Sequence, residues 1–590
     1  MGGAKEMENM INLTIDGVSV SVPAGSTVLE AARAANVNIP TLCYLKDVQQ
    51  IGACRICLVE IEGARGLAAA CVMPVSEGMV VRTNTQKLRE QRKVNLELLL
   101  ASHNRECTSC VRSENCELQA LCREYGVKEY PYDGAKKETA VDDLSPSIVR
   151  DNSKCINCRR CIAACTNVQE IGAIGVSKRG FKTQIGPIFG RPLIATSCVN
   201  CGQCIVACPV GAIHEKESID DVWAAISNPD KYVVVQPAPA VRASIGEEFG
   251  LPMGVAQTGK LVAALRRLGF DKVFDTNFGA DLTIMEEGTE LIHRLGDKDA
   301  VLPMITSCSP GWVSYCEKFY PEFIPNLSSC KSPHEMTGAM AKTYYAEKMG
   351  IDPKSIVVVS VMPCTAKKYE AERPELGNNG MQDVDHVITV RELARMIKQA
   401  GIDFARLPDE KFDSVMGESA GAADIFGATG GVMEAALRTV YEIVTGKELE
   451  NVNFEAVRGT DGVKEATIDL NGKQINVAVA HGTANAKKVL EAVKSGEKTY
   501  HFIEVMCCPG GCVTGGGQPI VSSKDLQYID LKKVRAQALY NEDANKSIRK
   551  SHENPEIKAI YDEFLGEPGG HKAHELLHTT YSAKAKYYVY

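Results

Sequence analysis

The sequence predicts a multidomain protein of the α+β and α/β classes, in which small cysteine-bearing modules precede one large α/β domain. Most of its 23 cysteines form tight groups before residue 210. The rest of the chain alternates apolar runs with helical patterns, and such runs are typical of buried parallel strands. These runs are residues 232–237, 355–361 and 475–480, with helices predicted at 262–268 and 390–399. A chain of 590 residues is also too long for one core.

The composition argues against several classes of protein. Hydrophobic residues make up 45% and charged residues 24%, and a net charge of -8 disfavours a nucleic-acid binder. No apolar run of about 18 residues indicates a membrane span. Residues 1–6 lack the apolar core of a secretory signal, so the cytoplasm is the predicted compartment. In a reducing compartment, tight cysteine spacings indicate metal sites rather than disulfides.

Residues 1–83 form the first predicted module. Alternating residues 11–22 around Asp16-Gly17 predict a β-hairpin, and residues 27–35 a helix capped by Ser26. A short central pair of cysteines with two outlying ones then resembles the ligands of plant-type 2Fe–2S ferredoxins, although the first gap is longer here. These residues are Cys43, Cys54, Cys57 and Cys71. Zinc sites also use Cys-x-x-Cys, but the spacings favour iron–sulfur clusters.

Residues 84–125 form the second predicted module, with a helix at 86–103. One histidine and three cysteines follow: His103, Cys107, Cys110 and Cys116. They resemble the mixed 4Fe–4S ligand set of large hydrogenases and of the large iron–sulfur subunit of NADH dehydrogenase. A neutral imidazole in place of a thiolate tends to raise the cluster potential. Cysteines that fit no motif are interpreted as small buried hydrophobes; these are Cys122, Cys316 and Cys330.

Residues 126–154 are polar and interrupted by proline, which predicts a linker. Residues 155–218 then carry two cysteine runs with one spacing, that of bacterial ferredoxins with two 4Fe–4S clusters. In this pattern the fourth cysteine of each run binds the other cluster. One predicted set is therefore Cys155, Cys158, Cys161 and Cys208, and the other is Cys198, Cys201, Cys204 and Cys165.

Residues 219–590 form the predicted catalytic domain, and three segments within it are rich in cysteine, proline and glycine. They are Thr306-Ser-Cys-Ser-Pro-Gly-Trp312, Met362-Pro-Cys-Thr-Ala-Lys-Lys-Tyr-Glu370 and Glu504-Val-Met-Cys-Cys-Pro-Gly-Gly-Cys-Val-Thr-Gly-Gly-Gly-Gln-Pro519. Glycines allow left-handed turns and close approach to a large ligand. Together the segments resemble the signatures of the iron–iron hydrogenases. The active site of that family is the H-cluster, a 4Fe–4S cube bridged to a two-iron unit with CO, cyanide and dithiolate ligands.

The resemblance implies a role for each matching residue. Cys364, Cys508 and Cys512 would hold the cube, with Cys512 as the bridge to the two-iron unit. Donors to the cyanides would be Lys367 and the backbone around Pro239 and Ala240, and Met362 and Met506 would line the pocket.

A proton route is also implied. Residues 285–294 read as a helix, with Glu287 and Glu290 on one face and Arg294 four residues further. That spacing alone is typical of a solvated, salt-bridged face. The resemblance instead implies a relay from Cys308 through Glu287, Ser328 and Glu290 to Arg294 at the surface.

One position departs from the family pattern. The family has Cys-Cys-Pro where this chain has Cys308-Ser309-Pro310, so a serine occupies the place of the fourth cube ligand. An additional cysteine, Cys507, precedes Cys508. Three alternatives stay open: Ser309 binds iron, Cys308 moves into the ligand place, or Cys507 supplies the thiolate. Thiolate is the softer ligand, which iron–sulfur clusters favour. We expect Cys308 to stay beside the two-iron site.

The predicted function is a cytoplasmic hydrogenase that interconverts 2H⁺ + 2e⁻ and H₂, with electrons from ferredoxin or a similar small carrier. Maturation proteins are expected partners, and nucleic acid and membranes are not. No nicotinamide or flavin fingerprint is found, and residues 427–431 predict a turn or helix start rather than a nucleotide loop. One rival is a hydrogen-sensing or electron-transfer protein with an altered cluster, which Ser309 favours. A second rival, an NADH dehydrogenase subunit, matches only the N-terminal third.

Overall fold

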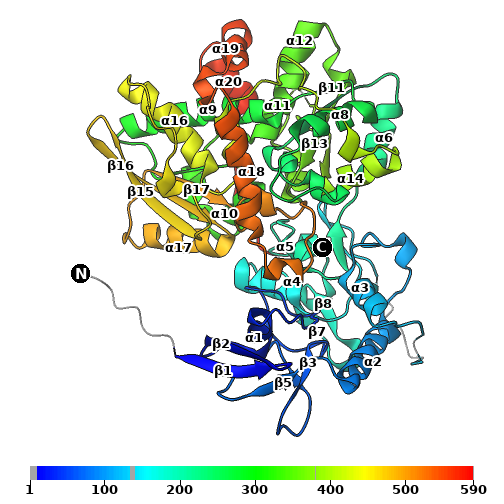
Figure 1. Ribbon diagram of the computed structural model, residues 1–590. Coiled ribbons are helices and arrows are strands. Elements are labelled where there is room, and N and C mark those ends of the chain that lie inside the picture. The colour runs from blue at the N-terminus through cyan, green and yellow to red at the C-terminus, as the bar shows by residue number, and fades with distance from the viewer. Residues whose placement is uncertain (1–8, 130, 133–139, 379, 589–590) are drawn as a thin grey trace.

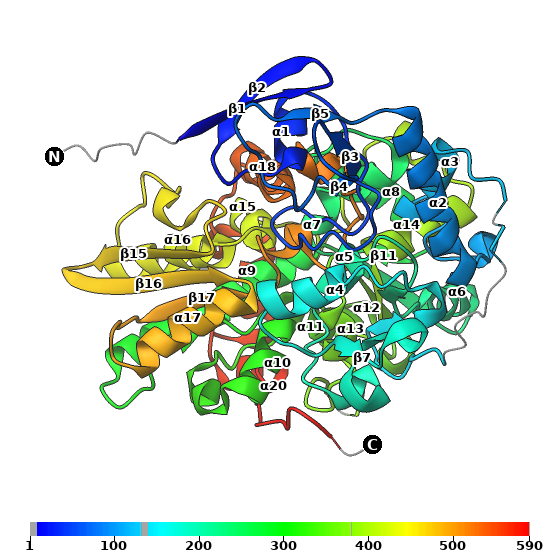
Figure 2. The same cartoon turned by 90° about the horizontal axis from the view of Figure 1, so that it is seen from below.

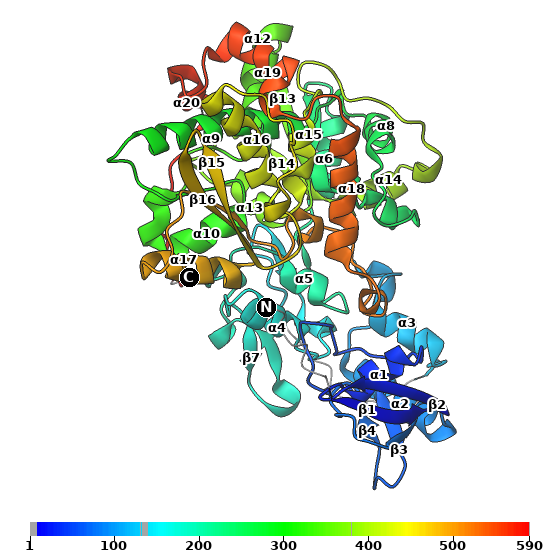
Figure 3. The ribbon, with the colours of Figure 1, turned by 60° about the vertical axis from the view of Figure 1, so that its left-hand side comes forward.

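The computed structural model describes residues 9–129, 131–132, 140–378 and 380–588. The N-terminal modules lie at one end of the molecule and the catalytic domain at the other (Figures 1 and 3). Residues 1–6, on which the expectation about an export signal depends, lie outside the described residues. Among the helices that are described, none has the length and apolar character needed to cross a membrane.

The first module is a five-stranded sheet packed against one helix. Its strand order is β2-β1-β5-β3-β4. The elements are β1 (Met10–Ile15), β2 (Val18–Pro23), α1 (Val28–Ala34), β3 (Leu58–Ile61), β4 (Ala68–Ala69) and β5 (Val80–Arg82). The predicted hairpin is confirmed, because β1 and β2 pair across a turn in which Asp16 and Gly17 have positive φ. The predicted helix cap is wrong. Thr27 caps α1, because its hydroxyl accepts from the Glu30 amide while the Glu30 carboxylate accepts from the Thr27 amide.

The next two modules are small and mainly helical. Their elements are α2 (Gln86–Ser102), α3 (Glu117–Glu124), β6 (Ile148–Arg150), α4 (Arg160–Ala163), β7 (Gly175–Ser177), β8 (Gln184–Gly186), α5 (Gln203–Ala207) and β9 (Ile213–Glu215). The end of the predicted linker 126–154 is not a linker. It forms β6, which pairs with β9, and the side chains of Ile148 and Val149 in this strand are buried. Residues 130 and 133–139 of that predicted linker lie outside the described residues.

The catalytic domain contains two four-stranded sheets. The first is wholly parallel, in the order β11-β10-β13-β14, and the second has the order β12-β17-β16-β15. The strands are β10 (Tyr232–Pro237), β11 (Lys272–Val273), β12 (Met304–Ile305), β13 (Ile356–Met362), β14 (His386–Thr389), β15 (Val463–Leu470), β16 (Lys473–His481) and β17 (Phe502–Met506). The three predicted strands therefore exist as β10, β13 and β16. The third differs from the prediction, since β16 is parallel to β17 but antiparallel to β15.

Helices cover both sheets. They are α6 (Ile219–Ser227), α7 (Pro239–Arg242), α8 (Thr258–Leu268), α9 (Thr276–Gly296), α10 (Pro310–Phe319), α11 (Pro333–Met340), α12 (Ala346–Met349), α13 (Ala366–Ala371), α14 (Val390–Gln399), α15 (Gly421–Asp424), α16 (Gly431–Thr445), α17 (Thr483–Lys494), α18 (Leu531–Asn545), α19 (Pro555–Ile560) and α20 (His571–Leu577). Helix α9 is shared by two cores. Phe278 and Leu282 pack with β10 and β13, whereas Ala280 and Ile284 pack with β16 and β17. Residues 427–431 lead into α16, so the predicted helix start is confirmed.

The ferredoxin-like module lies beneath the catalytic domain, with α4 and α5 on the side nearest to it (Figures 1 and 3), and in the view from below it lies in front of the catalytic domain (Figure 2). The backbones touch where Gly202 meets Gly516, since a Cβ added to Gly516 would lie 2.6 Å from the Gly202 Cα. Gln203 donates to the Thr514 carbonyl over 3.0 Å, and Thr365 donates to the Asn200 carbonyl over 2.7 Å. A side chain on either glycine would separate the two segments.

Candidate active site

A cavity lies where strands of both catalytic sheets end. Its walls come from the residues that directly follow β10, β12, β13 and β17, with further contributions from α9, α11 and the loop before α16. In open α/β sheets, ligands bind outside the carboxyl ends of the strands. The lining includes Pro239, Thr276, Cys308, Ser309, His334, Met362, Cys364, Lys367, Phe426, Met506, Cys507, Cys508 and Cys512. Ala240 lies behind this lining in the small core that contacts Cys512.

Three thiols converge at this cavity. Cys508 is buried, and Cys364 and Cys512 are partly buried. The Cys364 thiol lies beside that of Cys508, and Cys512 lies near Cys364. They come from two segments more than 140 residues apart in sequence, brought together by the ends of β13 and β17. Converging thiols are the ligand type that a 4Fe–4S cube takes. The residues present therefore fit three of the four cube positions.

A buried charged group, Lys367, also lines the cavity. Lys367 Nζ donates to Glu370 over 2.6 Å and to the Cys308 carbonyl over 3.2 Å. Glu370 also contacts His334 Nε2 at 2.6 Å. Burial opposes the charge of Lys367, but Glu370 outweighs it and raises the lysine pKa. Burial likewise opposes ionisation of Glu370, yet Lys367 and His334 lower its pKa to about 2. The ammonium at the cavity is therefore kept charged.

The sequence predicted apolar contacts from Met362 and Met506, and both methionines line the cavity. Phe426 adds to this wall and was not singled out from sequence. It precedes the predicted helix start at 427–431, where the buried Glu504 carboxylate accepts from the Gly430 and Met433 amides, each over 2.7 Å. This contact ties the loop before α16 to the end of β17.

The glycine-rich loop packs closely against other parts of the protein. Gly510 and Gly511 have positive φ and form the expected turn. A Cβ on Gly515 would lie 2.2 Å from the Pro363 carbonyl oxygen, and one on Gly517 would lie 2.9 Å from the Thr389 side chain. With Gly516 against Gly202, these glycines allow neighbouring segments of the protein to approach closely.

A line of polar side chains runs from the cavity along α9. Glu287 is buried, and neither of its carboxylate oxygens has a hydrogen-bond partner among the described residues. Ser328 lies beside it and donates to Glu290 over 3.1 Å. Glu290 accepts from Arg294 over 2.6 Å. Arg294 is 17% exposed, so it reaches the surface only in part. Burial and the nearby Glu290 charge raise the pKa of Glu287 to about 8.

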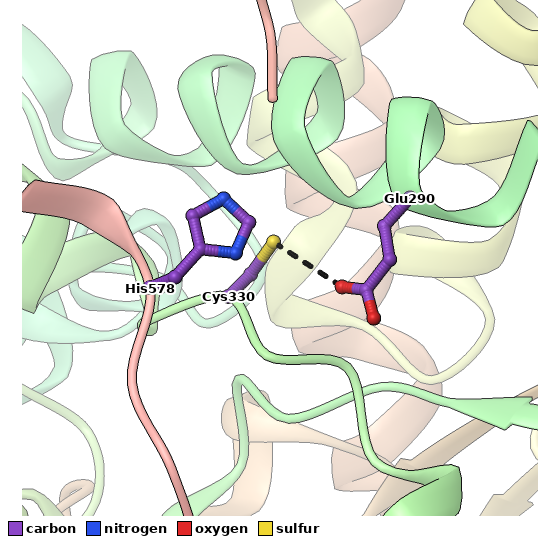
Figure 4. Close-up of side chains that lie close together, drawn as sticks. All are labelled: Glu290, Cys330 and His578. Atoms are coloured by element: carbon purple, nitrogen blue, oxygen red, sulfur yellow. Dashed lines mark hydrogen bonds between the residues drawn. The ribbon is translucent and has the colours of Figure 1, made fainter. Parts of the chain in front are cut away.

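The C-terminal segment contributes to this line, which the sequence did not indicate. Figure 4 shows His578 beside Cys330, whose thiol points toward Glu290 with a sulfur–oxygen distance of 3.9 Å. Ser329 links His578 to Glu290, because its hydroxyl lies 2.8 Å from His578 Nδ1 and donates to Glu290 over 3.1 Å. Cys330 is thus buried as expected, and Cys316 is too, whereas Cys122 is only partly buried.

Further candidate ligand groups lie in the N-terminal modules. In the first, the Cys43 thiol lies beside those of Cys54 and Cys71, and the Cys57 thiol lies beside that of Cys71. In the structure, the fourth cysteine of each ferredoxin-type run lies with the first three cysteines of the other run. One cavity is lined by Cys165, Cys198, Cys201 and Cys204, while Cys208 lies with Cys155, Cys158 and Cys161. These groups fit iron–sulfur clusters.

His103 lies at the end of α2, and the Cys110 and Cys116 thiols lie near each other. Burial lowers the pKa of His103 to about 4, so its ring is neutral at pH 7. Its Nδ1 is buried without a hydrogen-bond partner in the described part of the chain. A neutral imidazole with one unpartnered nitrogen can bind a metal.

Comparisons with known proteins agree with this geometry. The model of the iron only hydrogenase large subunit, C-terminal domain, matches residues 231–516, and that of the iron hydrogenase small subunit matches 529–584. Before them lie matches to a 2Fe–2S iron–sulfur cluster binding domain (8–86), the NADH-ubiquinone oxidoreductase-G iron–sulfur binding region (92–131) and the NADH-quinone oxidoreductase subunit 3 ferredoxin-like domain (145–214).

Similar proteins span nearly the whole chain. The NADP-reducing hydrogenase subunit HndD of Solidesulfovibrio fructosivorans is 52% identical over 97% of this chain and 99% of its own length. Iron hydrogenase 1 of Clostridium pasteurianum is 48% identical over 97% of this chain and 100% of its own. A solved structure of the [FeFe]-hydrogenase HydA1 from Chlamydomonas reinhardtii superposes with a TM-score of 0.56 at 46% identity, covering 62% of this chain and 99% of its own.

The family's cofactors follow from these matches: one 2Fe–2S cluster, three accessory 4Fe–4S clusters and the H-cluster. The chain belongs to the iron–iron hydrogenases, as a large modular member of the clostridial type.

Proposed function

We propose that this hydrogenase exchanges electrons with ferredoxin or a similar small carrier, in the cytoplasm, and passes them through its accessory clusters to the catalytic cavity. The observation that carries the proposal is the meeting of three thiols and a line of protonatable groups at one cavity. When bound, the H-cluster supplies the irons at which protons and electrons combine. Maturation proteins would insert its two-iron unit. A reducing compartment would keep 23 cysteines available for clusters.

Each accessory cluster is proposed to have four ligands. The 2Fe–2S cluster takes Cys43, Cys54, Cys57 and Cys71, and the mixed 4Fe–4S cluster takes His103, Cys107, Cys110 and Cys116. The remaining two take Cys155, Cys158, Cys161 and Cys208, and Cys198, Cys201, Cys204 and Cys165. Plant-type clusters work near about -400 mV, which suits proton reduction. The last group lies against the catalytic loop at Gly516, so it is the proposed exit of the electron path.

In the cavity, Cys364, Cys508 and Cys512 are proposed to hold the cube, with Cys512 at the bridge. Lys367 would donate to an anionic cyanide, since Glu370 holds it charged. The second donor would be the Ala240 amide, because Pro239 has no N–H. That amide lies in the first turn of α7, where amides have no partner within the helix. Met362 and Met506 would pack against the apolar ligands.

The proton route is proposed to run from Arg294 through Glu290, Ser328 and Glu287 to Cys308. Glu290 binds both Arg294 and Ser328, so it links the surface to the interior. Glu287 lies near Cys308, whose pKa is raised by burial and by the Glu287 charge. A thiol that stays protonated can hold a proton at the cavity. This set of neighbouring protonatable groups supports an enzyme over a hydrogen-sensing or electron-transfer protein.

The stability of the folded protein should depend on pH because the pKa of Glu287 is raised. In the unfolded chain a glutamate ionises near about 4.3, whereas the folded chain retains this proton up to about 8. Between these values the folded state binds more protons, so the stability of the wild type falls as pH rises, by at most about 1.4 kcal/mol per unit. Glu287→Gln removes this penalty. Its melting temperature relative to wild type should rise from pH 5 to 8 and then level off.

Thermal unfolding followed by circular dichroism under anaerobic conditions would measure this. Glu347→Gln, at an exposed glutamate of α12, is the control for loss of a surface carboxylate. A difference between Glu287→Gln and wild type that does not change with pH would contradict the assignment.

Turnover should depend on Glu290. Glu290→Gln keeps the shape but removes the ionisable proton carrier, so H₂ evolution should fall by about 10²–10⁴-fold while the iron content stays unchanged. Glu317→Gln is the control, because Glu317 is a buried glutamate that also pairs with an arginine, Arg373, and is not part of the proposed route. Near-wild-type H₂ evolution by Glu290→Gln would rule out this path.

The electron donor can be tested directly. The relative HndD is named as a subunit of an NADP-reducing hydrogenase, but no nicotinamide or flavin fingerprint occurs in this chain. We therefore expect the fully loaded protein to evolve H₂ with reduced ferredoxin and to give no H₂ with NADPH alone. H₂ measured by gas chromatography with each donor decides the matter. Turnover with NADPH alone, or none with ferredoxin, would overturn this part of the proposal.

A further inference from the structure

We propose that Cys507, rather than Ser309, supplies the fourth thiolate of the H-cluster cube, and that Ser309 holds the backbone of Cys507 in place. The inference rests on the proposed function, since it takes the cube to be the cofactor of this cavity. It concerns the one cube position at which the family's ligand pattern has a cysteine and this chain has none.

Residues 309 and 507 face each other across neighbouring segments. Strands β12 and β17 are parallel, with Ile305 opposite Ile503. The same register carried past the strand ends places residue 309 opposite residue 507. The Cys507 amide donates to Ser309 Oγ over 3.2 Å, which shows that the register persists. Paired strands lie about 4.8 Å apart. A thiol moved from 309 to 507 therefore stays at the same cavity, which both residues line.

The serine hydroxyl already has a structural partner. Ser309 Oγ accepts the hydrogen bond from the Cys507 amide. To bind iron it would have to lose its own proton, and an alkoxide is a harder and more basic ligand than a thiolate. Iron–sulfur clusters are held mainly by thiolates. A free thiol at the neighbouring position is therefore the better ligand.

Of the two uncommitted thiols, Cys507 lies near two of the proposed cube ligands, whereas Cys308 lies near one. The Cys507 side chain lies beside Cys201 and near Cys508 and Cys364. Cys308 instead lies near Glu287, Lys367 and Cys512. That is the side on which the proton route ends. The two thiols thus occupy different sides of the cavity, and Cys308 need not leave its place.

The surroundings of Cys507 are built for a sulfur atom. A Cβ on Gly311 would lie only 2.8 Å from Cys507 Sγ, so a larger residue there would displace the thiol. Gln169 donates to the Cys507 carbonyl over 2.9 Å, and its Nε2 lies 3.9 Å from Cys507 Sγ. The Thr483 amide fixes Gln169 by donating to its Oε1 over 3.0 Å. An N–H group beside a thiolate stabilises its charge.

The arrangement brings two proposed clusters into contact through one residue. Cys201 is a proposed ligand of the last accessory cluster, and the Cys507 thiol touches it. A cube bound through Cys507 would therefore have its fourth ligand on the side that faces the incoming electrons. Binding of iron by the thiol releases its proton.

The test uses full-length protein produced without the two-iron unit and reconstituted anaerobically. Wild type should hold about 18 irons, of which about 14 belong to the accessory clusters. Cys507→Ala should fall to about 14 irons and lose the electron paramagnetic resonance signal of the cube. Ser309→Ala should keep about 18. The double variant Cys507→Ala, Ser309→Cys should regain the cube by restoring the thiol at the family's position.

Cys316→Ala is the control, since Cys316 is a buried cysteine of α10 that bonds to the Tyr320 carbonyl. Intact accessory signals show that each variant has folded. Cys507→Ser, which keeps an oxygen donor, should lose the cube or shift its potential. The proposal is overturned if wild type binds only about 14 irons, if Cys507→Ala keeps the cube, or if Ser309→Ala loses it. Failure of ferredoxin-driven H₂ evolution, after the two-iron unit has been added to a protein that retains the cube, would count against the proposed function alone.

Discussion

Contact between two glycine-containing backbones positions the two halves of this molecule. Gly202, in the ferredoxin-like module, meets Gly516, in the loop after β17, with no side chain between them. Electron transfer between metal groups requires such proximity, and so does the contact between Cys201 and Cys507. Hydrogen bonds from Gln203 and Thr365 to backbone carbonyls cross the boundary at the same place. A larger residue at either glycine would move the accessory module away from the catalytic cavity.

The buried charges follow a second constraint. A buried ion is costly unless it is paired, and the cavity wall obeys this rule through Lys367 and Glu370. Glu290 and Arg294 do the same at the outer end of α9. Glu287, between them, has no partner of this kind among the described residues. It therefore remains protonated at neutral pH, and a group that is neutral but close to titrating suits the transfer of a proton.

Local spacing predicted much of the molecule. The cysteine runs, the hairpin at Asp16 and the apolar strands are contained within short windows, and the structure places the cysteines of the two ferredoxin-type runs in the expected groups. Contacts between distant segments were not accessible in this way. The register of β12 on β17, which sets Ser309 beside Cys507, depends on strands almost two hundred residues apart. His578 and Gln169 reach the site from the C-terminal segment and from the ferredoxin-like module, and neither lies in a recognisable motif.

The cap of α1 shows a different limit, because both Ser26 and Thr27 are good caps and only the position of Glu30 selects Thr27. The catalytic role of the cavity is tested most directly by supplying the two-iron unit to anaerobically purified protein and measuring H₂ evolution from reduced methyl viologen. We expect infrared bands of bound CO and cyanide together with steady H₂ production. Bands that show a bound two-iron unit, without H₂ production, would contradict it.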